Sequence, residues 1–94
     1  MYTVQFTNAS LRRFKKLPQD VQDEIKKQVG ILRENPLHGE PLKGVFHQFR
    51  SLHVSHKGIS YRVIYKFFSK LNTVVIYLAD KRENIYKRLF EMKI

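Results

Sequence analysis

Hydrophobic and polar positions recur along this chain with two different periods, which mark out strands and helices. Residues 2–6 alternate between apolar and polar positions in the manner of a strand. Apolar residues then recur at helical spacing over residues 11–17 and 21–32, with charged residues between them. Pro18 separates these two segments and suits the first turn of a helix, and Asn35-Pro36 ends the second segment. The pattern predicts a strand followed by a helical hairpin.

The second half of the chain has the pattern of three strands and a helix. Three stretches are rich in β-branched and aromatic residues, and they cover about residues 48–55, 59–68 and 73–80. Lys57-Gly58 and residues 70–72 are turns short enough to join these stretches as antiparallel hairpins. A helix is predicted over about residues 83–92, with Ile85 and Leu89 on its inner side.

The order of these elements predicts an α+β fold, β-α-α-β-β-β-α, as a single domain over residues 1–94. We expect a small antiparallel sheet of about four strands, packed against the N-terminal helical hairpin and the C-terminal helix. Antiparallel sheets can leave one face partly open. Ser51, His53, Arg62 and Lys66 are expected to point to that open face and to make it basic.

The charge of the chain is strongly positive and unevenly spread. Eighteen Lys and Arg residues against eight Asp and Glu residues give a net charge of +10, and no carboxylate occurs between Pro41 and Ala79. A folded domain with such a field is expected to meet a polyanion or an acidic protein. Five basic residues are candidates for contacts with RNA: Lys43, Arg50, Lys57, Lys66 and Lys81.

The composition excludes several classes of protein. With 43% hydrophobic and 13% aromatic residues, the chain is too apolar for a disordered basic tail. The absence of cysteine excludes disulfides and thiolate zinc sites. No apolar run reaches the roughly 18 residues that a transmembrane helix needs. The first residues also lack a basic flank followed by an apolar segment, so no secretory signal is predicted. We therefore expect a cytoplasmic protein.

Four segments, taken in order, resemble the RelE/ParE superfamily of toxins from bacterial toxin–antitoxin pairs. The segments are Leu42-Lys-Gly-Val, Arg50-Ser-Leu-His-Val, Tyr61-Arg-Val-Ile-Tyr, and Ala79-Asp-Lys-Arg followed by Tyr86. The resemblance covers nearly the whole chain, including the order of its elements. It implies one of two activities, because RelE-like members cut messenger RNA in the ribosomal A site, whereas ParE-like members poison DNA gyrase and lack the cutting residues.

The resemblance also implies which residues would cut RNA. The Arg on the middle strand of RelE-like members corresponds to Arg62, the Arg after the last strand to Arg82, and the aromatic residue that follows to Tyr86. Some relatives carry paired lysines on the preceding strand, where this chain has Ser51 and His53. That departure removes two bases of the lysine type and supplies a histidine, which certain other ribonucleases of the superfamily use.

The four candidate catalytic residues suit cleavage of RNA through its own 2′-hydroxyl. His53 is the candidate base, since imidazole exchanges protons near neutral pH. Arg62 and Arg82 can bind the non-bridging phosphate oxygens through their planar guanidinium groups. Tyr86 can stack on a base or orient the reacting groups. The proton donor to the leaving oxygen is not decided by the residues; Arg82 takes that role by resemblance alone. Neither a metal nor another cofactor is expected, because the middle segment has no carboxylates for magnesium.

Each of these residues also has a simpler interpretation. His53 could be a surface or packing residue of its strand. Arg62 could pair with Asp80. Arg82 could be no more than a solvent-exposed residue at the start of a helix. Tyr86 lies at helical spacing from core positions and could itself be core.

The leading hypothesis is therefore a ribosome-dependent endoribonuclease toxin, an mRNA interferase that inhibits translation. The resemblance implies two partners: messenger RNA on the ribosome, and a cognate acidic antitoxin that forms a hetero-oligomer with the toxin on operator DNA. One alternative is a ParE-like gyrase inhibitor that uses Lys87, Arg88 and Lys93 of the C-terminal helix as a contact surface. The other alternative is a basic nucleic-acid-binding module without toxicity.

Overall fold

A computed structural model describes residues 1–92 of the chain and confirms the α+β fold with the predicted order of elements. Eight helices and strands make up the fold: β1 (Thr3–Phe6), α1 (Asn8–Phe14), α2 (Gln19–Val29), β2 (Glu40–Pro41), β3 (Arg50–His56), β4 (Ile59–Phe68), β5 (Thr73–Lys81) and α3 (Arg82–Glu91). Three short 3-10 turns cover Gly30–Arg33, Gly44–Phe46 and Ser69–Leu71. No helix within residues 1–92 is both long and apolar enough to cross a membrane.

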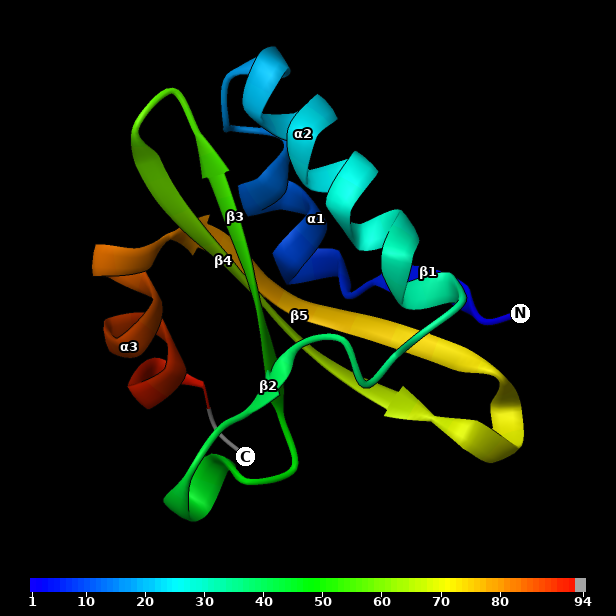
Figure 1. The fold of residues 1–94 in the computed structure, drawn as a ribbon. Coiled ribbons are helices and arrows are strands. Elements are labelled where there is room, and N and C mark those ends of the chain that lie inside the picture. The colour runs from blue at the N-terminus through cyan, green and yellow to red at the C-terminus, as the bar shows by residue number, and fades with distance from the viewer. Residues whose placement is uncertain (93–94) are drawn as a thin grey trace.

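The strands form one five-stranded sheet in the order β1-β5-β4-β3-β2 (Figure 1). The β3–β4 and β4–β5 pairs are antiparallel, as predicted. Lys57 and Gly58 form the β3–β4 turn, and both have positive φ (50° and 78°), which matches the right-handed twist of a tight hairpin. The sheet departs from the expected antiparallel arrangement at β1, which pairs with β5 in parallel, and gains the two-residue strand β2 at its other edge.

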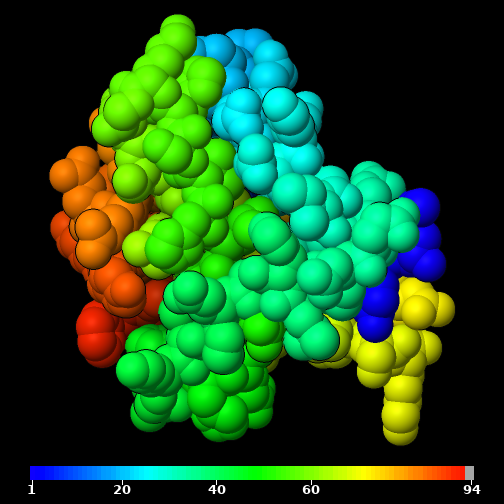
Figure 2. All heavy atoms as spheres, in the orientation of Figure 1, coloured from blue at the N-terminus to red at the C-terminus, as the bar shows by residue number. Residues whose placement is uncertain are grey.

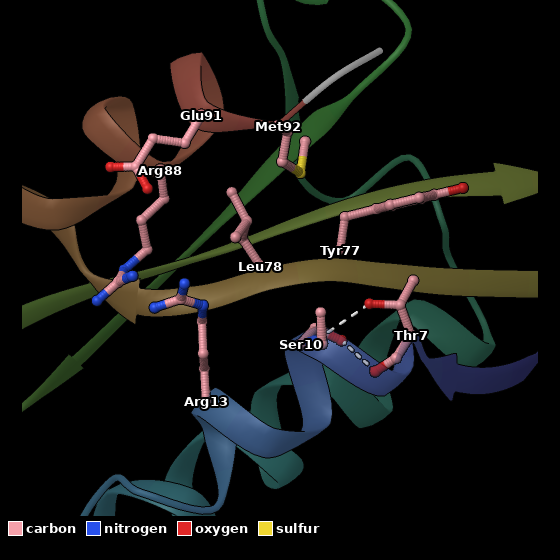
Figure 3. Close-up of a pocket in the computed structure, with 9 residues that line it drawn as sticks. Thr7, Ser10, Arg13, Tyr77, Leu78, Arg88, Glu91 and Met92 are labelled. Carbon is pink, nitrogen blue, oxygen red and sulfur yellow. Dashed lines mark hydrogen bonds between the residues drawn. The ribbon is translucent and has the colours of Figure 1, made fainter.

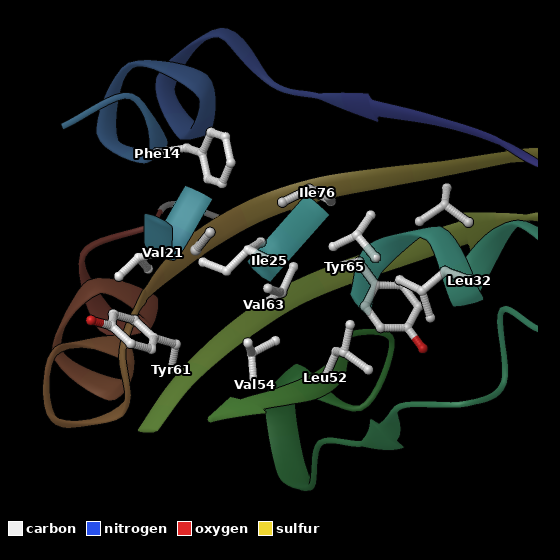
Figure 4. Close-up of a cluster of buried hydrophobic side chains, with 13 residues drawn as sticks. Phe14, Val21, Ile25, Leu32, Leu52, Val54, Tyr61, Val63, Tyr65 and Ile76 are labelled. Carbon is white, nitrogen blue, oxygen red and sulfur yellow. The ribbon is translucent and has the colours of Figure 1, made fainter. Parts of the chain in front are cut away.

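The larger core lies between one face of the sheet and the helical hairpin. The stripe of Val21, Ile25 and Val29 on α2, continued by Leu32, packs on strand residues of that face (Figure 4). Thirteen buried residues form this cluster, and Phe14 of α1 joins it at the β5 side. Burial of so much apolar area is the dominant stabilising contribution in a domain of this size.

A second, smaller core fills part of the face that the sequence predicted to be open. Ile85 and Leu89 of α3 pack there against Ile64 and Leu78 of the sheet and against Phe49, which directly precedes β3. The expectation of an open basic face was therefore wrong for part of it. Apolar residues on that face need a cover, and the amphipathic helix α3 supplies it. One consequence is that Ser51, expected on an open surface, is buried at 3% exposure.

The loop before β2 is fixed to the sheet by a buried tyrosine. The hydroxyl of Tyr65 donates to the Pro36 carbonyl at 2.6 Å and accepts from the Gly39 amide at 3.0 Å. Arg50 donates to the Gly39 carbonyl through Nε (3.1 Å) and Nη2 (2.6 Å), and also to the carbonyl of Leu37. Burial raises the pKa of Tyr65 above its ordinary value of 10.0, so the hydroxyl stays protonated as a donor. This network fixes the segment that leads into β2.

Candidate active site

Three polar side chains form a row across the face of the sheet that carries α3. His53 on β3 lies directly opposite Arg62 on β4, and Arg62 lies directly opposite Asp80 on β5. Directly opposed residues of an antiparallel pair share one face and have Cβ atoms about 4.5–5.5 Å apart. The row runs from exposed His53 through half-buried Arg62 to buried Asp80.

Arg82 reaches this row because α3 begins immediately after β5. His53, Arg62 and Arg82 line one surface hollow of about 380 Å³, together with Val54, Ser55, Ser60 and Tyr61. We call this the His53 hollow. In the space-filling view the β3–β4 hairpin and the start of α3 meet at the surface (Figure 2). Three of the four predicted catalytic residues are thus brought together in one hollow.

Tyr86 lies one helical turn beyond Arg82 and borders two neighbouring hollows. It lines one with Lys81, Arg82 and Glu83, and the other with Lys43, Ser51 and Arg62 among others. Its exposed fraction is 55%, so it is not a core residue. Because Arg82 and Arg62 each line a hollow shared with Tyr86, the fourth predicted residue adjoins two of the other three.

Ser51 lies on the predicted face of β3, but its burial in the site was not predicted from the sequence. Its side chain is buried, and its hydroxyl oxygen has no hydrogen-bond partner among the described residues. It lines one hollow with Arg62 and another with His53. Buried hydroxyl groups normally have a partner, so a partner for this one would have to come from the two hollows that Ser51 lines. The signal in the sequence was its spacing of two from His53, which places both side chains on the same face of β3.

The five predicted RNA-contacting residues fall into two groups. Lys43 and Lys81 line the hollows that contain Tyr86. The other three have contacts elsewhere. Arg50 binds the loop carbonyls already described, Lys57 Nζ lies 3.1 Å from Asp20 Oδ2, and Lys66 Nζ lies 4.5 Å from the ring centroid of Phe49. The structure does not bring these three to the hollows.

Asp80 is bound by the helix that follows it. Arg88 Nε donates to Asp80 Oδ2 at 2.6 Å, and the Lys81 amide and Asn84 Nδ2 donate to Oδ1 at 2.7 and 3.4 Å. The pairing of Arg62 with Asp80 that the sequence left open is therefore replaced by an Arg88–Asp80 ion pair. Lys93, considered with Lys87 and Arg88 as a contact surface, lies outside the described residues.

The far end of the β3–β4 hairpin is tied to α2. His56 Nε2 lies 2.8 Å from Asp20 Oδ2, and Lys57 approaches the same oxygen. These hydrogen bonds, chiefly the one from His56, lower the pKa of Asp20 from 3.8 to about 2. The contact holds in place the hairpin on which His53 and Arg62 stand.

The geometry has few groups suited to metal binding. No three His, Cys, Asp or Glu side chains gather as a metal site within residues 1–92. The residues that line the His53 hollow are one imidazole, two guanidinium groups, hydroxyl groups and an aliphatic side chain, with no carboxylate among those described. Such a lining binds anions and can accept a proton at the imidazole.

Comparison with known proteins identifies the family. The model of the ParE-like toxins of type II bacterial toxin–antitoxin systems matches residues 4–90. Toxin RelG of Mycobacterium tuberculosis is 33% identical over 89 residues, which are 93% of this chain and 98% of RelG.

Solved structures agree with this result. The toxin–antitoxin complex RelBE2 of Mycobacterium tuberculosis contains a chain that is 32% identical, with a TM-score of 0.73, over 86% of this chain and 91% of that one. The isolated RelE toxin of E. coli has the same fold, with a TM-score of 0.73 over 97% of both chains at 20% identity. The chain belongs to the RelE/ParE superfamily of toxins from type II toxin–antitoxin systems.

Proposed function

We propose that this toxin is a ribosome-dependent endoribonuclease that cuts messenger RNA and thereby inhibits translation. The observation that supports the proposal is that His53, Arg62 and Arg82 line one hollow at the surface. Tyr86 adjoins this hollow, and Lys43 and Lys81 add positive charge beside it. A site of this composition suits a phosphodiester, and its imidazole suits transfer of a proton.

The proposed reaction uses the 2′-hydroxyl of the substrate as the nucleophile. His53 takes the proton from that hydroxyl as its oxygen attacks the adjacent phosphorus. Arg62 and Arg82 bind the non-bridging oxygens, whose negative charge grows in the transition state. The bond to the 5′-oxygen then breaks, leaving a 2′,3′-cyclic phosphate and a 5′-hydroxyl end. We assign Arg82 as the donor to the leaving oxygen and Tyr86 as the residue that positions a base by stacking. No step of this scheme requires a metal ion.

Mapping of messenger RNA ends in cells tests this proposal. Induction of the wild-type protein should arrest growth and produce new 5′ ends within messenger RNAs. His53→Ala and Arg82→Ala should relieve the arrest while keeping a wild-type circular dichroism spectrum. His47→Ala and Arg33→Ala, which change exposed residues of the same types outside the hollow, should stay toxic. Intact transcripts during growth arrest would contradict the nuclease activity, and full toxicity of both site variants would contradict the assignment of the site.

We also propose that the chain binds a cognate acidic antitoxin. Solved relatives occur in toxin–antitoxin complexes, including one that is 32% identical to this chain, and the net charge of +10 favours an acidic partner. Co-expression with the product of the adjacent gene should yield a stable complex and abolish toxicity. Whether that complex binds operator DNA is tested by a mobility shift on the promoter of the gene pair.

Inhibition of DNA gyrase remains the second candidate function. The matching family model describes ParE-like toxins, and α3 exposes Lys87 and Phe90, the latter at 79%. A supercoiling assay with purified gyrase separates the two functions. Inhibition at stoichiometric concentrations, with transcripts intact in cells, would favour this candidate over the ribonuclease.

A further inference from the structure

We propose that Arg88 is a positioning residue of the site. It holds Asp80 in an ion pair and thereby keeps Arg62 free to bind the RNA phosphate. This inference rests on the proposed function, because Arg62 is one of the residues proposed to bind the phosphate in that function. Arg88 itself stands on α3, where its side chain lines a pocket between α3 and α1 rather than the His53 hollow.

Asp80 is the one carboxylate on strands β3, β4 and β5, and it lies directly opposite Arg62. Opposite charges at such a position attract each other across the strands. The backbone of Arg62 belongs to the sheet, but its guanidinium group makes no hydrogen bond or ion pair with residues 1–92, and the one ion pair of Asp80 there is with Arg88. An unpaired carboxylate here would therefore find Arg62 as its nearest cross-strand cation. A guanidinium paired in that way would have to leave the carboxylate before it could bind a phosphate.

Arg88 prevents this pairing because it binds the Asp80 carboxylate from α3. Its Nε lies 2.6 Å from Asp80 Oδ2, while the Lys81 amide and Asn84 Nδ2 take Oδ1. Both carboxylate oxygens thus have donors, none of which is Arg62. Asp80 is only 8% exposed, so these contacts are shielded from water. Figure 3 shows Arg88 extending from α3 toward β5, with Arg13 of α1 pointing into the same pocket.

The alternative is that the Arg88–Asp80 pair only fastens α3 to β5. Both interpretations predict that loss of Arg88 harms the toxin, since a buried charge without its partner is costly. They differ in the effect of removing the carboxylate while Arg88 is kept. If the pair only fastens the helix, Asp80→Asn breaks it as Arg88→Gln does and should also harm the toxin. If Asp80 blocks Arg62 once Arg88 is gone, removing the carboxylate charge restores the site.

Three variants separate these interpretations by their cleavage rates: Arg88→Gln, Asp80→Asn and the double variant Asp80→Asn/Arg88→Gln. We expect Arg88→Gln to lower cleavage of ribosome-bound messenger RNA by about tenfold or more, the usual effect of losing one charged hydrogen bond to the reacting group. Asp80→Asn and the double variant should cleave within about threefold of wild type. Arg33→Gln removes the same charge from an exposed position away from the site and should have no effect. A double variant no faster than Arg88→Gln would overturn the inference, and so would an inactive Asp80→Asn.

A second measurement reads the pairing directly and does not depend on cleavage. In protein labelled with nitrogen-15, the Nε–Hε resonance of Arg62, assigned by its absence in Arg62→Lys, reports a bond to a carboxylate. We expect this resonance to shift in Arg88→Gln and to return to its wild-type position in the double variant. An Arg62 resonance that is the same in all variants would contradict the inference whatever the cleavage rates. If instead no variant, wild type included, cuts RNA while the resonance behaves as expected, the proposed function fails, and what stands is that Arg88 keeps Asp80 from pairing with Arg62.

Discussion

Ser51 is the residue that most clearly separates stability from function in this site. Its hydroxyl is buried without a partner among the described residues, between hollows lined by His53 and Arg62. A buried hydroxyl that makes no hydrogen bond destabilises the folded state. The same hydroxyl can donate to a phosphate or a ribose oxygen of bound RNA. Its unfavourable burial is then offset only in the complex.

Ser51→Ala should therefore raise stability and lower activity. We expect the free energy of unfolding in urea to rise by about 1 kcal/mol, because the unpaired polar atom is removed. Cleavage of ribosome-bound messenger RNA should fall. Ser55→Ala, an exposed change on the same strand, gives the reference for stability and should alter it by less than about 0.5 kcal/mol. A less stable Ser51→Ala protein would mean that the hydroxyl has a partner in the folded state. Unchanged cleavage would mean that it does not contact RNA.

At the scale of residues, the sequence was informative where strand alternation alone decides the outcome. His53 and Arg62 could each be assigned to a face of the sheet, because successive side chains of a strand point to opposite faces. The partner of Asp80 could not be chosen, because Arg62 and Arg88 are both chemically suitable. The choice depends on where α3 packs, and that packing includes Phe49 and Ile64, which are remote from α3 in the sequence.

The loop between α2 and β3 is the element that most depends on one buried side chain. Tyr65 holds it through bonds to Pro36 and Gly39. Gly39 packs so tightly that a Cβ atom there would lie 2.6 Å from the Tyr65 hydroxyl oxygen and 2.8 Å from the Ser51 carbonyl. This close approach places β2 beside Ser51, with Glu40 as its direct cross-strand neighbour.

Tyr65→Phe should loosen this loop. The change leaves the buried Gly39 amide without an acceptor, which should lower the free energy of unfolding by about 1–3 kcal/mol. Hydrogen exchange at the Gly39 amide should become faster, while exchange in the centre of β4 should change only as much as the global stability does. A Tyr65→Phe protein with wild-type stability and wild-type exchange at Gly39 would show that the two hydrogen bonds do not hold the loop.

The β3–β4 hairpin should release its contact with α2 in acid. The lowered pKa of Asp20, about 2 against an ordinary 3.8, means that the carboxylate adds stability above about pH 4. That contribution is lost as the pH falls through about 2. Thermal unfolding between pH 5 and pH 1.5 measures it. Asp20→Asn should lose less stability than wild type over this range, and His56→Gln should remove most of the difference. Equal acid dependence in wild type and Asp20→Asn would contradict the role of this contact.

At the scale of elements, local patterns predicted the hairpins well and the long-range pairings poorly. Lys57-Gly58 and residues 70–72 are turns in the structure, as their composition indicated. The parallel pairing of β1 with β5 joins residues about 70 positions apart, and no local pattern encodes such a pairing. The cover of α3 over Ile64 was missed because Ile64 alternates with Arg62 and Lys66, which suggested a solvent-exposed face.

For the whole molecule, seven of the eighteen Lys and Arg residues that give the net charge of +10 fall into two groups. Arg50, Lys57 and Lys66 contact a loop, a carboxylate and aromatic rings. A second group lines three hollows that share lining residues: Lys43, Arg62, Lys81 and Arg82. The charge could be read from the sequence, but this division could not, because it depends on which cations the fold provides with partners.

The central claim is that the protein cuts RNA by using the 2′-hydroxyl of the RNA as the nucleophile. This claim depends on the site residues, on the elements that hold them and on the overall charge. The most direct test uses purified protein and ribosomes programmed with a defined messenger RNA, with the product ends identified. We predict a single cut that leaves a 2′,3′-cyclic phosphate and a 5′-hydroxyl, and no cut in a messenger RNA with a 2′-deoxynucleotide at that position. Cleavage of the deoxy-substituted RNA at the same rate, or no cleavage of either RNA, would contradict the account.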